Sequence, residues 1–152
     1  MAKNNIGNTN ERQAAIASPL ASLPTWILSS AATRSHQILR KRLAQAGVDG
    51  YEYRCLTALV SKGQLSQTEL GDAVMLDPRD VTHTVRALEG RGFASRQKDP
   101  SHGRRILVSL TAAGRRTADG LAPVMVNVQD EVFGRVSPEE RSTLLRLLQR
   151  IG

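Results

Sequence analysis

The chain has 152 residues, of which 40% are apolar, and its 21 Lys and Arg against 14 Asp and Glu give a net charge of +7. This length and composition are typical of one globular domain with its own core, and they exclude two independently folded domains. No run approaches the ~18 consecutive apolar residues of a membrane span. The start, MAKNNIGNTNERQ, lacks the charged-then-apolar order of a signal peptide. We therefore expect a cytoplasmic protein without a membrane segment.

The sequence contains no pattern that supports catalysis or metal binding. Cys55 is the only cysteine, which excludes an internal disulfide and any Cys-x-x-Cys pair of zinc ligands. His36, His83 and His102 share no metal-ligand spacing. Phosphate-binding loops, dinucleotide fingerprints and nucleophile elbows are also absent from the sequence. We therefore expect no catalytic residues, no metal and no cofactor, and we expect that the protein is not an enzyme.

The N-terminal third of the chain predicts a tail followed by two helices. Residues 1–18 are rich in Asn, Thr, Gln and Ala without periodicity, which predicts a disordered tail. From Pro24 no helix breaker occurs until Gly47, which indicates one long helix. A second helix is expected over 51–60, and its apolar face consists of Cys55, Leu56, Leu59 and Val60.

Two capped helices are expected next. Ser66 and Glu69 have the spacing of a capping box, which predicts that a short helix begins there. Asp77 is the expected N-cap of the following helix, with Pro78 in its first position. In that helix the buried stripe is expected to consist of Val81, Val85 and Leu88, so that the opposite face is polar and basic.

The C-terminal half predicts two strands and then two helices. The strands are expected over 93–98 and 106–110, and the Pro/Gly-containing segment DPSHGRR, residues 99–105, is the expected loop between them. Thr111 is the expected cap of a helix that runs to about Arg135, and Ser137 is the expected cap of the last one. That last helix carries an apolar stripe that needs a partner: Leu144, Leu145, Leu147, Leu148 and Ile151.

Positive charge is concentrated in one quarter of the chain. Between Arg79 and Arg116 there are three acidic residues, Asp80, Glu89 and Asp99. The same segment holds nine basic residues: Arg79, Arg86, Arg91, Arg96, Lys98, Arg104, Arg105, Arg115 and Arg116. Because neutralising phosphates releases counterions, such a localised field favours a nucleic-acid partner over a merely solvated surface.

These elements, in this order, are similar to the MarR family of winged-helix transcriptional regulators. The residues that carry the resemblance are the Arg-Ala-Leu-Glu-x-x-Gly run over 86–92 and the segment with Asp99-Pro100, Arg104 and Leu110-Thr111. The resemblance implies a mainly α (α+β) fold, a winged helix-turn-helix with N- and C-terminal dimerisation helices. It implies a DNA-binding domain over 48–113, with dimerisation helices over 19–47 and 114–152.

The resemblance also implies a function. Family members commonly form homodimers that repress by binding double-stranded DNA at a palindromic operator, and many release it when a small molecule binds. This chain departs from the family pattern at His102, where an aspartate usually precedes the wing arginine by two residues. It also has His83 where an arginine is frequent. The first departure removes the expected acidic partner of Arg104, and the second predicts a different base preference.

The resemblance and the chemistry of the side chains together assign candidate DNA contacts. On the helix over 78–90, which would lie in the major groove, the candidates are Arg79, Asp80, Thr82, His83 and Arg86. Arg104 suits the minor groove, and Lys98 and Arg105 suit the phosphate backbone. As alternatives, Asp80 acts only as a helix cap, and Thr82 contacts a phosphate rather than a base.

Three further expectations concern other sites. Trp26, His36 and Arg40 lie where family members bind effectors, although each has a simpler explanation in packing or solvation. Leu144, Leu145 and Leu148 are the expected dimer contacts. Cys55 fits either a redox sensor or, as its inward spacing favours, a buried packing residue. Two alternative functions remain open for the whole protein. The first is a winged helix that docks RNA or protein without operator specificity. The second is an enzyme in which the winged helix serves only for dimerisation.

Overall fold

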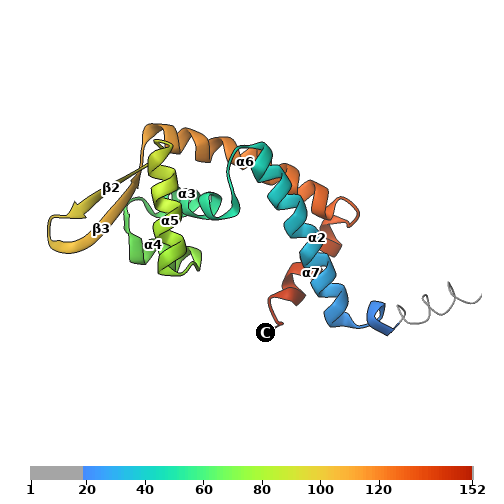
Figure 1. The fold of residues 1–152 in the computed structure, drawn as a ribbon. Coiled ribbons are helices and arrows are strands. Elements are labelled where there is room, and N and C mark those ends of the chain that lie inside the picture. The colour runs from blue at the N-terminus through green and yellow to red at the C-terminus, as the bar shows by residue number, and fades with distance from the viewer. Residues whose placement is uncertain (1–18, 152) are drawn as a thin grey trace, which may run out of the picture. The chain divides into compact units, whose positions relative to one another are not determined.

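The computed structural model describes residues 19–151, which fall into two units. The first unit ends at Gln37 and the second begins at Ile38. Helix α2, Pro24–Gln45, begins in the first unit and ends in the second (Figure 1). The tail expected over 1–18 lies outside the described residues. Among the described helices, none is both long enough and apolar enough to cross a bilayer.

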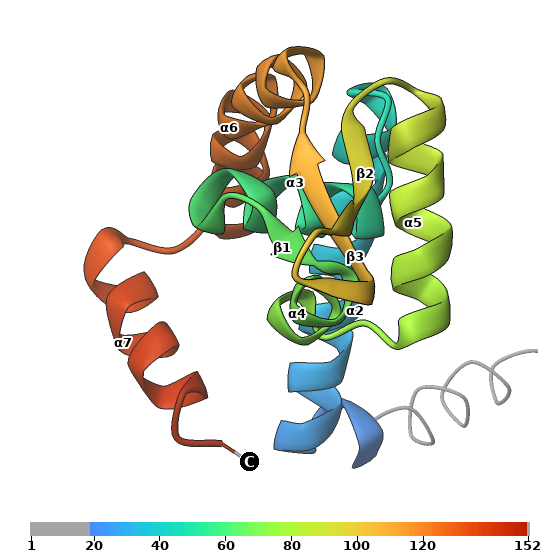
Figure 2. The same cartoon turned by 90° about the vertical axis from the view of Figure 1, so that its left-hand side faces the viewer.

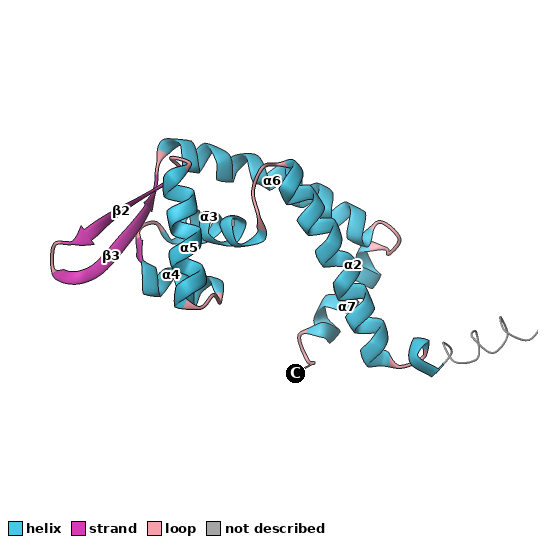
Figure 3. Ribbon diagram, in the orientation of Figure 1, coloured by secondary structure: helices cyan, strands magenta, loops and turns pink. Residues whose placement is uncertain are grey.

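The second unit is mainly helical and contains one small antiparallel sheet, as Figure 3 shows. The sheet has the strand order β1-β3-β2. Its strands are β1 (Leu65–Ser66), β2 (Ala94–Asp99) and β3 (His102–Leu110). The helices after α2 are α3 (Gly50–Lys62), α4 (Gln67–Val74), α5 (Pro78–Gly90), α6 (Ala112–Phe133) and α7 (Pro138–Leu148). The fold class expected from the sequence is therefore confirmed.

Side-chain caps fix where the helices begin. The capping box of Ser66 and Glu69 and the N-caps Asp77, Thr111 and Ser137 are confirmed. A further cap at Asp49 was missed: its carboxylate accepts the amide protons of Tyr51 and Glu52, and the Glu52 carboxylate returns to the Asp49 amide at 3.0 Å. Each cap satisfies backbone donors that the first helical turn leaves without partners.

The core lies where α3, α4 and α5 meet the sheet. Val81, Val85 and Leu88 of α5 are fully buried, which confirms the expected stripe. Cys55 is also fully buried, but Val60, expected on the same face, is 37% exposed. The face of α3 is therefore narrower than the sequence predicted. The other buried apolar residues of this cluster are Leu43, Val48, Leu56, Leu59, Leu70, Val74, Ala94, Val108 and Leu121.

The strands differ from the expectation in two ways. β1 was missed, since a strand of two residues has no periodicity to detect. β3 begins at His102 rather than at position 106, so most of the expected loop belongs to a strand. Asp99 pairs with His102, which closes the hairpin at Pro100 and Ser101. Residues such as Gly, His and Arg have weak strand preference, and here cross-strand pairing decides instead.

Helix α6 begins in tight contact with the turn that follows α5. The Thr111 hydroxyl donates to the Gly92 carbonyl at 2.6 Å and accepts from the Gly114 amide at 3.0 Å. Gly114 is buried, and a Cβ at this position would overlap the backbone carbonyl of Phe93. The helix runs on past Pro123, which lies inside it.

Helix α7 buries none of its side chains fully. Leu144 is 39% exposed, Leu145 43% and Leu147 44%. In the described chain the C-terminal stripe is therefore not covered, although the sequence predicts that it needs a partner.

We predict opposite effects on stability for two alanine substitutions in α6. Gly114→Ala should lower the free energy of unfolding by about 1–3 kcal/mol or more, because the new methyl group meets rigid backbone. Gly120→Ala is the control, since no atom lies within 4 Å of its added Cβ. It should raise stability by up to about 1 kcal/mol through helix propensity. Urea unfolding followed by circular dichroism measures both; equal effects would contradict the close approach at Gly114.

Candidate nucleic-acid interface

Helix α5 presents one exposed basic face. Arg79, His83 and Arg86 follow one another at i, i+4 and i+7, so they lie on the same side of the helix, and all three are exposed. The buried Val81, Val85 and Leu88 occupy the other side. Among the described residues, no ion pair engages Arg79 or Arg86. This face is free to meet a polyanion.

The first turn of α5 separates the roles of two carboxylates. Asp77 is the cap, because its Oδ1 accepts the amide protons of Arg79 and Asp80, both at 2.9 Å. These bonds, with that of Asp80 the strongest, hold the pKa of Asp77 below its ordinary value. Asp80 is half-buried in the first turn, where a negative charge complements the helix dipole.

Thr82 is held within the protein rather than free. Its hydroxyl donates to the Pro78 carbonyl at 2.7 Å and accepts from the Gln67 side-chain amide at 3.0 Å. Gln67 begins α4, so this contact joins the two helices of the helix-turn-helix. The sequence analysis missed Gln67, because nothing in its spacing indicates a contact 15 residues away.

Two of the nine basic residues counted in the sequence fix α5 in place. Arg91 lies just after α5, and its Nη1 donates to both oxygens of Glu52 at 2.8 and 2.9 Å, while Nη2 donates to the Gly47 carbonyl at 2.6 Å. Arg96 on β2 pairs with Glu89 of α5 at 2.7 Å. These pairs join α5 to the turn before α3 and to β2, which lies alongside α5 in Figure 2.

The β2–β3 hairpin extends from the helices as a wing (Figure 1). Lys98 and Arg104 on it are exposed, and neither forms an ion pair with any residue that the structure describes. Arg105 differs, because its Nη2 lies 2.6 Å from Glu69 Oε1 and its Nε lies 3.8 Å from Asp99 Oδ2. His102 Nδ1 lies 3.9 Å from the same Asp99 oxygen. The wing therefore presents free cations at Lys98 and Arg104.

The expected effector residues all lie on α2 and are exposed. Trp26 and His36 belong to the first unit and Arg40 to the second, so their joint role stays a prediction. A cavity of about 370 Å³ was missed, because α3 and α6 form it from segments far apart in the sequence. Its lining residues are Tyr53, Thr57, Val60, Ala118, Asp119, Leu121, Ala122 and Met125.

Cys55 is buried in the core of the second unit. It is completely inaccessible in the core, and burial raises its pKa from 9.0 to about 11. The thiolate is the form that oxidants and electrophiles attack, so this environment suppresses both reactions. The geometry supports the packing residue rather than the redox sensor.

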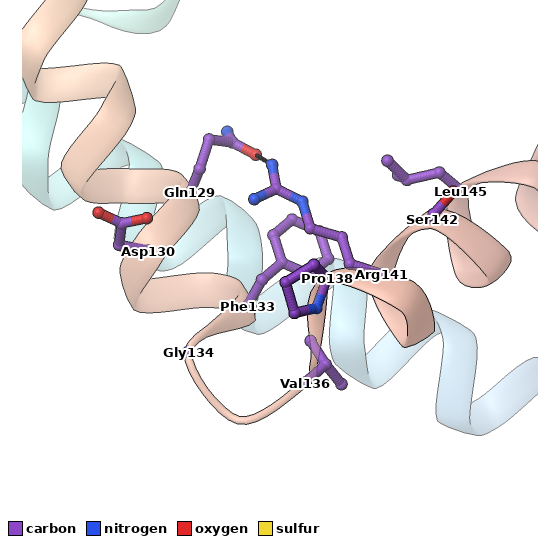
Figure 4. Close-up of a pocket in the computed structure, with 9 residues that line it drawn as sticks. All are labelled: Gln129, Asp130, Phe133, Gly134, Val136, Pro138, Arg141, Ser142 and Leu145. Carbon is purple, nitrogen blue, oxygen red and sulfur yellow. Dashed lines mark hydrogen bonds between the residues drawn. The ribbon is translucent and has the colours of Figure 1, made fainter.

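Of the expected dimer contacts, only Leu145 lines a groove between α6 and α7, whereas Leu144 is exposed and Leu148 is half-buried. The volume of this groove is about 590 Å³, and Phe133, Val136, Pro138 and Leu145 supply its apolar lining. Figure 4 shows the Arg141 side chain beside the Phe133 ring, with its guanidinium carbon 4.6 Å from the ring centroid and a hydrogen bond of 3.3 Å to Gln129. Arg141 therefore helps to hold α7 beside α6.

Comparison with known proteins identifies the relatives of this chain. The model of the MarR family matches residues 51–124. An HTH-type transcriptional regulator of Bacillus subtilis, YdgJ, is 29% identical over 137 residues, which cover 83% of this chain and 84% of the relative.

Solved structures agree with this match. A probable transcriptional regulator from Pseudomonas aeruginosa is 30% identical, with a TM-score of 0.77, over 88% of this chain and 99% of that one. The Bordetella bronchiseptica regulator BpsR, whose DNA binding is regulated by 6-hydroxynicotinic acid, is 25% identical, with a TM-score of 0.74, over 82% of this chain and 95% of that one.

Proposed function

Because this chain belongs to the MarR family and is a transcriptional regulator by that membership, we propose that it is a homodimeric repressor of a palindromic operator. The exposed basic face of α5 is the observation that carries the proposal. A helix that presents Arg79, His83 and Arg86 on one side can place them against base edges in the major groove. Arg104 on the wing then suits the minor groove, and Lys98 suits a phosphate.

The assignment of these side chains to the two grooves follows from the chemical groups that each groove presents. The major groove offers a distinct donor and acceptor pattern for each base pair, whereas the minor groove mainly distinguishes A·T from G·C. Arg79, His83 and Arg86 would therefore read sequence, and Arg104 would respond to groove width. Asp80 and Thr82 contribute differently. The Asp80 carboxylate stabilises the N-terminus of α5 through the helix dipole. The Thr82 hydroxyl already donates one hydrogen bond and accepts another, so only its methyl group and one remaining lone pair can contact DNA.

The experiment that tests the function is selection of DNA fragments from the genome that encodes the protein, followed by footprinting. We expect an imperfect palindrome with half-sites about one helical turn, ~10 bp, apart. Selection of RNA in preference to any duplex, or binding that hardly depends on salt, would contradict the proposal and favour a docking module.

We predict that the helix and the wing respond differently to alanine substitution. His83→Ala or Arg86→Ala should cost on the order of 1–3 kcal/mol on the preferred operator and relax preference at one base position per half-site. Arg104→Ala should weaken binding to many sequences and reduce only a preference for flanking A·T pairs. A randomised duplex library at fixed salt measures all three variants. If Arg104→Ala changes the central motif and the helix variants leave it intact, the groove assignment is wrong.

The proposed dimer rests on apolar surface that the chain leaves exposed. In the second unit, Leu144 and Leu147 of α7 lie on one exposed side, away from the groove that Leu145 lines. In the first unit, Leu20, Leu23 and Ile27 are each about half exposed. Contiguous apolar surface of this kind marks interaction sites, and a second copy is the partner that the family provides.

We predict that a carboxylate in the α7 stripe dissociates the dimer. Leu144→Asp and Leu147→Asp should each yield monomer in sedimentation velocity, since a buried carboxylate without a partner is strongly disfavoured. DNA affinity should fall with dimerisation. Ser142→Asp is the control, because it adds the same charge at an exposed position on the opposite side of α7 from Leu144 and Leu147. If both leucine variants remain dimeric, α7 is not the interface.

The proposed effector site is the cavity between α3 and α6. Its volume of about 370 Å³ falls within the range of small-molecule pockets, and its lining is largely apolar, with hydroxyl groups from Tyr53 and Thr57 and the carboxyl group of Asp119 as its polar groups. A ligand there would contact α3, which packs against α5, and α6, which leads to α7. Both the DNA-binding and the dimerisation elements could then respond to it.

We predict that filling this cavity abolishes release by ligand. Ala122→Trp should bind operator as the parent does but no longer release it when hydroxylated aromatic acids, 6-hydroxynicotinic acid among them, are added. Ala112→Trp, the same substitution at an exposed position outside the cavity, should remain responsive. Operator binding measured by fluorescence anisotropy, with and without each compound, checks the prediction. Full release in the Ala122→Trp variant would place the effector elsewhere.

A further inference from the structure

The wing lacks backbone pairing at the position where Arg105 lies. β2 and β3 pair in regular register from Ala94 with Leu110 to Lys98 with Ile106, and the next pair is Asp99 with His102. Residues 103–105 therefore have no partner across the hairpin. On the other edge, β1 pairs with β3 only at Val108 and Leu107. Residues 103–105 therefore form a bulge that pairs with neither neighbouring strand, and other contacts must fix its geometry.

Arg105 supplies such a contact, because its side chain joins the bulge to the helix-turn-helix. Its Nη2 lies 2.6 Å from Glu69 Oε1, and its Nε lies 3.8 Å from Asp99 Oδ2 at the wing turn. Glu69 is itself fixed, since its other oxygen accepts the Ser66 amide proton at 2.8 Å. Asp99 is fixed as well, and accepts the Ser101 amide proton at 2.8 Å. Arg105 thus bridges two anchored carboxylates on different elements.

We propose that Arg105 is a positioning residue, which locks the wing to the N-terminus of α4 through Glu69 and so sets where the neighbouring Arg104 enters DNA. The inference rests on the proposed DNA-binding function and assigns Arg105 a role other than the phosphate contact that the sequence suggested. Two carboxylates already neutralise its charge, whereas Arg104 has no ion-pair partner among the described residues. A phosphate would have to displace Glu69 to reach Arg105.

The electrostatics of Glu69 agree with this geometry. The Ser66 amide, and next the Arg105 guanidinium, lower the pKa of Glu69 from 4.5 to about 2. The carboxylate is therefore ionised at every pH at which the protein would bind DNA. The Arg105 pKa is raised by the same contact.

The test depends on whether Glu69→Gln raises or lowers the affinity for operator DNA. Glu69→Gln keeps the capping box, since glutamine serves at this position as glutamate does, but it removes the charge that holds Arg105. Removing a negative charge near DNA would by itself tighten binding. If Arg105 positions the wing, Glu69→Gln instead weakens operator affinity, by about twofold to fivefold per half-site, the range of an exposed ion pair. If Arg105 contacts phosphate, Glu69→Gln tightens binding, which would overturn the proposal.

Salt dependence and coupling complete the test on the full chain. Arg105→Ala should weaken binding without changing the slope of log affinity against log salt, whereas Arg104→Ala, the adjacent control, should reduce that slope by about one per half-site. The double variant Glu69→Gln/Arg105→Ala should bind no more weakly than Arg105→Ala alone. A reduced slope in Arg105→Ala, or independent effects of the two substitutions, would overturn the positioning role.

A measurement without DNA separates this proposal from the proposed function. Amide hydrogen exchange over 98–106 in the free protein should be faster in Glu69→Gln and Arg105→Ala than in the parent and in Arg104→Ala. Unchanged exchange in both variants would overturn the positioning role of Arg105 even if operator binding is confirmed. Conversely, a parent protein that binds no duplex specifically would refute the function, and faster exchange in both variants would still establish the contact.

Discussion

Burial of one face of α5 is the constraint from which the site follows. Val81, Val85 and Leu88 are almost wholly inaccessible in the core, and each buried aliphatic side chain contributes roughly 1.5–3 kcal/mol relative to exposure. A helix has only one such face to bury, so the rotation of α5 is fixed, and Arg79, His83 and Arg86 must point outward. The positions of the basic side chains therefore result from the packing of apolar ones. No separate contact is needed to orient these basic side chains outward.

The arginines between α5 and the wing have two opposite roles. Arg91, Arg96 and Arg105 each pair with a glutamate of another element, whereas Arg86 and Arg104 have no ion-pair partner among the described residues. The paired arginines join α5, β2 and the wing to their neighbours. The local positive surplus counted from the sequence is therefore larger than the charge available to DNA. Among the described residues, the arginines and lysine of residues 79–116 without an ion pair are Arg79 and Arg86 on α5, Lys98 and Arg104 on the wing, and Arg115 and Arg116 near the start of α6.

Local signals predicted the helices well and the long-range contacts poorly. The caps at Ser66, Asp77 and Ser137 involve residues only two or three positions apart, and all were read correctly. The pairing of Arg105 with Glu69 joins residues that are 36 positions apart in the sequence and become adjacent only after folding. No periodicity encodes such contacts. For the same reason the sequence could nominate Arg104 and Arg105 together but could not separate a free cation from a paired one.

The exposed apolar residues connect the fold to the geometry of recognition. Half of the side-chain surface of Trp26 and much of Leu144 and Leu147 are accessible in the single chain, although its core elsewhere is closed. A chain of this size has limited core volume, so an apolar face left outside is covered most economically by another copy. In the proposed dimer, the separation of the two α5 helices would set the spacing of the half-sites that they can read. Any ligand that shifts α6, which joins the wing to α7, would alter that spacing without touching a single residue that contacts DNA.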